Sequence, residues 1–279
     1  IFSCGIFMAT SRAGSDMNKH ILVIGGGVIG LSVAYECAKR GLKVTLLERN
    51  AAERDSGAFG NAGMIVPSHF VPLAAPGMVA LGLKWMWNPE SPFYIKPRLD
   101  SGLIGWALKF WQAATPAHVQ RSAPVLRDLN LASRACYEEL AALPQLEFGL
   151  VKKGLLMLCR TAHALEEEAQ GAEKARALGV PAEVLDEAGT AALDPGARFS
   201  ITGSVYYPRD CHLSPDRFRA ALVADCQARG VRFLAEREVI GWSRDGGRLR
   251  AVQTNQGEVE GGQFVLAGGA WSGEAIRPL

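Results

Sequence analysis

A glycine-rich turn between an apolar strand and a helix constrains the fold of this chain more than any other feature. Residues 21–24 form an apolar run that is typical of a buried parallel strand. The sequence G-G-G-V-I-G follows at 25–30, and residues 31–40 then carry apolar side chains at helical spacing. A second apolar run at 43–47 ends in Glu48. The pattern predicts a complete β-α-β unit.

Three glycines of this turn have the spacing G-x-G-x-x-G, which binds the pyrophosphate of a dinucleotide. Gly25 permits the tight turn, Gly27 lets backbone amides approach the pyrophosphate, and Gly30 lets the helix pack closely on the strand. The amino end of the helix adds partial positive charge. Glu48 can accept hydrogen bonds from ribose hydroxyls and would repel the 2′-phosphate of NADP. These residues are compatible with both NAD and FAD.

The stretch after Glu48 favours FAD over NAD. A nicotinamide enzyme would continue with further β-α-β units, whereas residues 49–76 are rich in Gly, Ala, Ser and Pro. Small residues within 56–67 would let the backbone approach a flat ring. Ser56 and Asn61 could hydrogen-bond to phosphate or to the edges of that ring.

Together these motifs resemble the FAD-dependent D-amino-acid oxidase superfamily. Ala34 and Gly41 fit the longer flavoprotein fingerprint, and the small residues of 56–77 add to the likeness. Within the superfamily, the chain is most similar to the small subunit of bacterial D-amino-acid dehydrogenases. The resemblance is specific at 20–77 and 200–275, and it is looser between them.

The resemblance implies an α/β (α+β) fold, in which an inserted mixed α+β substrate domain interrupts a Rossmann-like FAD-binding domain. We expect the FAD-binding domain at 17–77 and 200–279, the substrate domain at 78–199, and a non-native or disordered leader at 1–16. Both domains are expected to be incomplete. The expected cofactor-binding residues are Gly25, Gly27, Val28, Ile29, Gly30, Glu48, Arg49, Ser56, Asn61, Ala62, Gly63, Met64, Val239, Ala267, Gly268, Gly269 and Trp271.

The implied activity is oxidative deamination of D-amino acids to 2-oxo acids and ammonia. Hydride passes from Cα to flavin N5, and the electrons continue to a quinone, O2 or another acceptor. Because the cofactor carries this chemistry, no catalytic residue is assigned. Met64, His69 and Tyr207 are candidates for the wall of the substrate pocket.

Two alternative functions stay open. One is a secondary-amine oxidase acting on glycine, sarcosine or a D-proline derivative, and the other is a non-catalytic dinucleotide-binding subunit. Family members continue beyond the length of this chain with a loop at the flavin end and an arginine that grips the substrate carboxylate. We therefore expect a C-terminally truncated chain that is inactive alone.

Composition argues against several other classes of function. The chain has 30 Lys and Arg against 28 Asp and Glu, with the signs interspersed, so nucleic acid is not an expected partner. No apolar run reaches the ~18–20 residues of a spanning helix. No two of the six cysteines lie within four residues, which excludes a C-x-x-C pair. The histidines His69, His118 and His163 lack ligand spacing, so no metal is expected.

Residues 81–111 combine tryptophans with lysines. Leu103, Trp106 and Trp111 fall on one face of a predicted helix, and Lys84 and Lys109 flank that face. Such a face could be buried against the flavin domain. Alternatively, it could lie on a membrane surface, where basic residues beside exposed Trp are favoured. The expected location is the cytoplasm, with peripheral attachment to the inner face of the cytoplasmic membrane as the further expectation.

Overall fold

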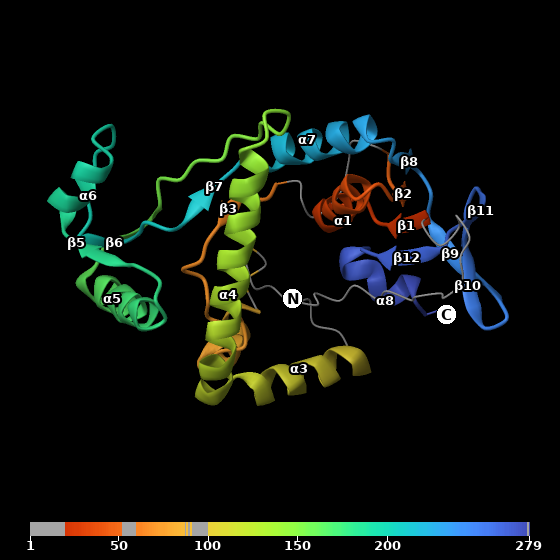
Figure 1. The fold of residues 1–279 in the computed structure, drawn as a ribbon. Helices are drawn as coiled ribbons and strands as arrows, with labels where there is room; N and C mark the ends of the chain where they lie inside the picture. Colours follow the sequence, from red (N-terminus) through yellow and green to blue (C-terminus); the bar gives the residue numbers. More distant parts are fainter. Residues whose placement is uncertain (1–19, 52–59, 87, 89, 91–99, 278) are drawn as a thin grey trace. The chain divides into compact units, whose positions relative to one another are not determined.

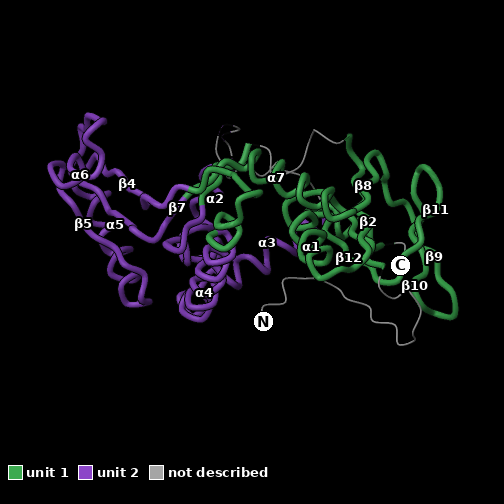
Figure 2. Tube along the Cα trace, turned by 45° about the horizontal axis from the view of Figure 1, so that its top comes forward, with its two compact units in different colours: residues 1–64, 138–150, 212–279 green, residues 65–137, 151–211 purple. Residues whose placement is uncertain are grey.

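The computed structural model describes residues 20–51, 60–86, 88, 90, 100–277 and 279. The chain divides into two compact units, which Figure 2 distinguishes by colour and which are described separately. The first unit comprises residues 1–64, 138–150 and 212–279, and the second comprises residues 65–137 and 151–211. The division between a cofactor domain and a substrate domain stays a prediction.

A four-stranded parallel sheet forms the centre of the first unit (Figure 1). Its strands are β1 (His20–Ile24), β2 (Lys43–Leu47), β8 (Arg232–Leu234) and β12 (Gln263–Leu266), in the order β12-β1-β2-β8. Residues 21–24 of β1 are all buried, because other elements cover both faces of the sheet. That environment accounts for the continuous apolar run that the sequence shows here. The predicted α/β class is confirmed.

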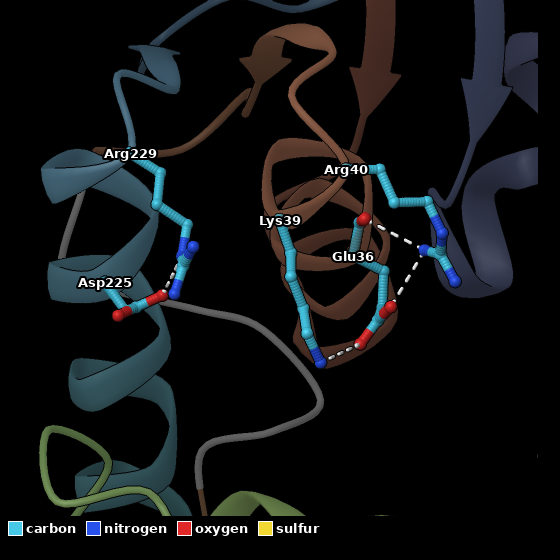
Figure 3. Close-up of polar contacts among 5 residues, drawn as sticks. All are labelled: Glu36, Lys39, Arg40, Asp225 and Arg229. Carbon is cyan, nitrogen blue, oxygen red and sulfur yellow. Dashed lines mark hydrogen bonds and ion pairs between the residues drawn. The ribbon is translucent and has the colours of Figure 1, made fainter.

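Two helices of this unit, α1 (Val28–Lys39) and α7 (Pro215–Ala228), pack against each other. α1 buries Leu31 and Tyr35, and the guanidinium of Arg229 lies 5.5 Å from the Tyr35 ring centre. Ion pairs lie near the carboxyl ends of both helices (Figure 3). Glu36 contacts Lys39 and Arg40 on α1, and Asp225 accepts a hydrogen bond from Arg229 beyond the end of α7. The Glu36 pairs are exposed, so each contributes less than about 1 kcal/mol.

An antiparallel meander covers one face of the parallel sheet. Its strands are β9 (Val239–Asp245), β10 (Arg248–Thr254) and β11 (Gly257–Glu260). The sequence Asp245-Gly246-Gly247 predicts a hairpin turn. The turn is present between β9 and β10, and both glycines have positive φ, which glycine adopts without strain. An apolar cluster that includes Leu22, Leu47 and Val252 joins the meander to the sheet. After β12, the chain forms the short helices η2 (Gly269–Trp271) and α8 (Ser272–Ala275).

The second unit contains a three-stranded antiparallel sheet in the order β4-β6-β5. The strands are β4 (Leu155–Cys159), β5 (Glu183–Leu185) and β6 (Gly203–Tyr207). Helix α5 (Ala162–Ala177) packs against this sheet, and its Ala172 and Ala175 join Val205 and Tyr207 in the core. The remaining helices and strands of the described residues are α2 (Met78–Trp85), α3 (Ser101–Ala113), α4 (Pro116–Ala141), α6 (Glu187–Leu193) and the paired strands β3 (Met64–Ile65) and β7 (Cys211–His212).

Two expected elements differ from the structure. The apolar stretch 146–158 predicts two strands, but only 155–159 forms a strand. Phe148 is instead buried against Phe218 of α7, with the ring centres 4.9 Å apart, so packing explains its apolar character without strand pairing. The helix expected from Ala123 begins earlier, at Pro116.

The tryptophan-bearing segment is helical, as predicted. However, no residue of α3 is buried, and the exposed fractions of Trp106 and Trp111 are 47% and 63%. Trp87, which belongs to the same predicted cluster, lies outside the described residues.

Candidate functional site

Two glycines of the first turn lie where no other residue would fit. Gly25 has a φ of +110°, and a Cβ on it would lie 2.4 Å from the carbonyl oxygen of Ala267. A Cβ on Gly30 would lie 1.8 Å from the carbonyl oxygen of Gly25. These approaches bring the start of α1 and the end of β12 close to the end of β1. The roles of a tight turn and of close helix packing, which the sequence predicts, agree with this geometry.

Gly27 differs from its two neighbours in the motif because the space beside it is open. Among the described residues, apart from Gly27, its two chain neighbours and the backbone of its own helix, no atom lies within 4 Å of the position that a Cβ would occupy. Gly27 is also the N-cap of α1, and no side chain caps the first turn or places an acidic group there. The first amides of a helix have no partner within the helix, so this end can receive the negative charge of a pyrophosphate.

Glu48 is fixed at the end of β2 by the backbone around it. Its Oε2 accepts a hydrogen bond from the amide of Gly26 at 2.7 Å, and its Oε1 accepts one from the amide of Asn50 at 2.9 Å. The Glu48 carbonyl oxygen accepts from the amide of Arg237 at 2.8 Å. Each carboxylate oxygen keeps further acceptor capacity, which the two hydroxyls of a ribose could use.

A cavity of about 480 Å³ connects these groups at the carboxyl ends of β1, β2 and β12. This is the edge of an open parallel sheet at which ligands bind. The predicted site residues that line the cavity are Gly25, Gly27, Val28, Ile29, Glu48, Arg49, Val239, Ala267, Gly268, Gly269 and Trp271. All of them belong to the first unit.

The rim of the cavity carries a stacked pair of side chains. The guanidinium of Arg49 lies 4.0 Å from the centre of the Trp271 ring.

Val239 starts β9, and its side chain packs into the apolar cluster between the meander and the sheet. Its backbone therefore stays available to the cavity while its side chain contributes to the core.

The other predicted site residues lie elsewhere or outside the described residues. Gly30 packs beneath the turn, and Ser56 is not among the described residues. Residues 61–64 do not line the cavity. Asn61 accepts a hydrogen bond from the amide of Gly63 at 2.8 Å, and Gly63 in turn accepts one from the amide of Leu213 at 2.9 Å. These contacts shape the turn, and the contact of residues 61–64 with the flavin ring stays a prediction.

The three candidates for a substrate-pocket wall have different environments. Tyr207 is buried in the core of the second unit, and burial raises its pKa. His69 is exposed, and its Nδ1 shares a hydrogen bond with Ser68 Oγ at 3.0 Å. Met64 is exposed as well. None of the three lines the cavity described above, and their place in a substrate pocket stays a prediction.

Several cavity residues were not predicted from the sequence. Arg237, Glu238 and Ile240 line it from the start of the meander, and Glu274 and Ala275 line it from α8. Trp242 holds α8 in place, because its Nε1 donates to the carbonyl oxygen of Ala275 at 2.7 Å. Arg237, Glu238 and Ile240 could have been predicted to line the cavity, because they are close in sequence to Val239, which was predicted to do so.

The fold and the cavity define a dinucleotide-binding protein. The family model of the FAD dependent oxidoreductases (DAO) matches residues 20–279, and the chain belongs to that family. An open Gly27, an uncapped helix end and an anchored Glu48 fit the FAD that this family uses.

Comparison with curated proteins finds relatives with one shared name. The chain is 35% identical over 263 residues to a D-amino acid dehydrogenase of Cereibacter sphaeroides, covering 93% of this chain and 60% of the relative. It is 32% identical over 262 residues to a D-amino acid dehydrogenase of Phenylobacterium zucineum, covering 92% and 61%. The chain thus spans about three fifths of the length of these relatives.

Among solved structures, the glycine oxidase from Bacillus cereus has a similar fold. The TM-score is 0.66 at 21% sequence identity, and the match covers 92% of this chain and 57% of the oxidase. At this level of identity, the likeness establishes a shared fold.

Proposed function

We propose that the complete protein is an FAD-dependent dehydrogenase that deaminates D-amino acids. The observation that carries this proposal is the match to D-amino acid dehydrogenases over 93% of the chain, at 35% identity to the Cereibacter protein. The cavity at the carboxyl ends of the parallel strands gives that match a site in this chain. The products would be a 2-oxo acid and ammonia.

The residues that line the cavity would hold FAD. The backbone at Gly27 and the first amides of α1 would receive the pyrophosphate, Glu48 would accept hydrogen bonds from the ribose, and the backbone at Val239 would contact the adenine. Bound FAD supplies an acceptor for the hydride from the substrate Cα. The residues of this chain would thereby fix the orientation of the cofactor, and orientation determines which substrate atom faces it.

An assay of the complete protein with FAD tests the proposal. We expect D-alanine to yield pyruvate and ammonia in the presence of an artificial electron acceptor, and we expect no product from L-alanine. Turnover of glycine or sarcosine in place of D-alanine would instead support an amine oxidase, for which the fold of the glycine oxidase is the supporting observation. FAD binding without turnover of any of these compounds would support a non-catalytic subunit.

We further propose that the acceptor is a quinone reached from a membrane surface. Apolar side chains on α2 and α3 are exposed, including Leu83, Ile104, Trp106 and Trp111, and Lys84 and Lys109 lie on the same helices. Tryptophan beside lysine suits the interface of an anionic bilayer. Across the described parts of the chain, no helix combines the length and apolar character needed to span a bilayer.

Vesicle binding tests this part of the proposal. We expect the complete protein to sediment with vesicles that contain anionic lipid, and we expect the Trp106→Ser/Trp111→Ser variant to sediment several-fold less. Leu158→Ser/Val184→Ser is the control, because both are exposed apolar side chains that lie on strands β4 and β5 instead of α2 or α3. Equal sedimentation of all three proteins, or peroxide formation that matches dye-linked turnover, would contradict a membrane quinone as acceptor.

A further inference from the structure

A second cavity of about 570 Å³ lies in the first unit, at the opposite end of the parallel strands from the cofactor cavity. The strands β1, β2 and β8 begin there, with His20, Lys43 and Arg232 as their first residues. Strand β11 of the meander supplies part of the other side. Nothing in the proposed oxidation uses this cavity.

Strand register places its basic side chains on one face of the sheet. His20 pairs with Lys43 across β1 and β2, and Thr45 pairs with Arg232 across β2 and β8. Because side chains alternate along a strand, Lys43 and Thr45 share a face with Leu47, and that face packs against the meander. The basic residues therefore lie on the same face of the sheet as the apolar cluster, at the end where the strands begin.

The acidic groups of the cavity have partners, unlike two of its cations. Glu260 pairs with Arg250 at 2.6 Å, and Glu258 accepts a hydrogen bond from Ser243 Oγ at 2.7 Å. In the part of the chain that the structure describes, neither Lys43 nor Arg232 has an ion pair with a carboxylate. Lys43 and Arg232 can therefore attract an anion from solution.

A third cation is held in position beside them. Arg237 lines the cavity, and its guanidinium donates to the backbone carbonyl oxygen of Gln256, another lining residue, at 2.5 Å. Arg237 also lines the cofactor cavity, so the two cavities share this residue. Leu234 and Val259 provide an apolar wall between the charged groups.

His20 responds to the positive charge of this cavity. Its Nε2 shares a hydrogen bond with Thr45 Oγ1 at 2.9 Å. Burial, followed by the charges of Lys43 and Arg232, lowers the pKa of His20 below its ordinary value. An anion placed between the two cations would oppose their effect and raise the pKa of His20 again.

We propose that this cavity binds a phosphate dianion, either free or carried by a small organic ester. Lys43 and Arg232 would neutralise the charge, Arg237 would donate from the far side, and Leu234 and Val259 would contact the carbon part of an ester. Three basic residues line this one cavity, and a tetrahedral dianion suits them because it presents oxygens in several directions.

Histidine NMR on FAD-saturated protein tests the proposal, because saturation with FAD blocks phosphate from the amino end of α1. The His20→Gln variant assigns the signal of His20, and His69, His118, His163 and His212 serve as internal controls. At constant ionic strength, we expect inorganic phosphate to raise the pKa of His20 and to leave those of the other four histidines unchanged. An equal effect of chloride would overturn the proposal.

Two double variants distinguish binding of phosphate in this cavity from a nonspecific effect of the protein's positive charge. Lys43→Gln/Arg232→Gln should weaken phosphate binding by about tenfold or more. Lys39→Gln/Arg40→Gln removes the same two residue types from α1, where both contact Glu36 outside the cavity (Figure 3), and should bind phosphate normally. Equal loss in both variants would refute the site. Tighter binding of ribose 5-phosphate than of phosphate would assign it to an ester, and equal binding would assign it to the free ion.

Discussion

The carboxylate of Glu48 accepts a hydrogen bond from the backbone amide of Gly26 at 2.7 Å. The acid at the end of β2 therefore helps to fix the turn that follows β1. One side chain thus links the expected ribose site to the expected pyrophosphate site, and its loss should affect both.

Replacement of Glu48 by Ala should weaken FAD binding by ~1.5–3 kcal/mol, the scale of a hydrogen bond to a charged group. The measurement is the dissociation constant of FAD from flavin fluorescence on reconstitution of the chain. Glu36→Ala removes an exposed carboxylate from the neighbouring helix and should leave the FAD dissociation constant unchanged. Unchanged affinity in the Glu48 variant would argue against a ribose role.

The glycines of the turn should separate cofactor binding from folding. Gly27→Val should abolish FAD binding yet leave the thermal unfolding midpoint of the apoprotein within a few degrees, because a Cβ there would point into space that is open among the described residues. Gly25→Ala should lower the midpoint strongly, because its Cβ would lie 2.4 Å from the carbonyl oxygen of Ala267. Circular dichroism and flavin absorbance check the pair. Normal FAD content in Gly27→Val would contradict the assignment.

The buried carboxylate of Asp210 makes a pH dependence measurable in the second unit. It accepts hydrogen bonds from the Ser68 amide at 3.1 Å and from Ser68 Oγ at 2.5 Å, but burial is the larger effect and raises its pKa. A carboxyl whose pKa is raised on folding favours the folded state at low pH, and this contribution is lost as the pH rises through the folded pKa.

The expected result follows from that sign. The free energy of unfolding of Asp210→Asn, relative to that of the unmodified protein, should increase as the pH rises from about 4 to 7, so the variant becomes relatively more stable. Urea unfolding at several pH values gives the difference. Asp216→Asn, at the exposed start of α7, is the control and should show no such trend. A difference for Asp210→Asn that stays constant with pH would contradict a raised pKa.

The parts of the site that the sequence predicted are those that depend on neighbours along the chain. Gly25, Gly27 and Glu48 belong to one β-α-β unit, in which strand, turn and helix signals are all local. Val239 and residues 267–269 came only from the family resemblance. They reach the cavity because β12 pairs with β1, a contact between segments far apart in the sequence that no local pattern specifies.

The same reasoning explains what was missed. Arg237 enters both cavities because its amide donates to the carbonyl oxygen of Glu48, a contact between distant segments. Phe148 resembled a strand residue because apolar runs of this length look alike whether they pair in a sheet or pack in a loop. Its partner, Phe218, lies on a helix 70 residues away. Tertiary packing, rather than local pattern, determines both positions.

The last prediction concerns thiol reactivity in the first unit. Cys226 and Cys136 are both free, but Cys226 is fully buried on α7 whereas Cys136 is exposed on α4. Burial raises the pKa of Cys226 to about 11, and its Sγ faces the carbonyl oxygen of Leu31 at 3.9 Å. Since the thiolate is the nucleophile, iodoacetamide at pH 8 should label Cys136 and spare Cys226. Labelling in urea should reach both cysteines, and peptide mass spectrometry distinguishes them. If Cys226 reacts as fast as Cys136 in the native protein, α1 and α7 are not packed together as described.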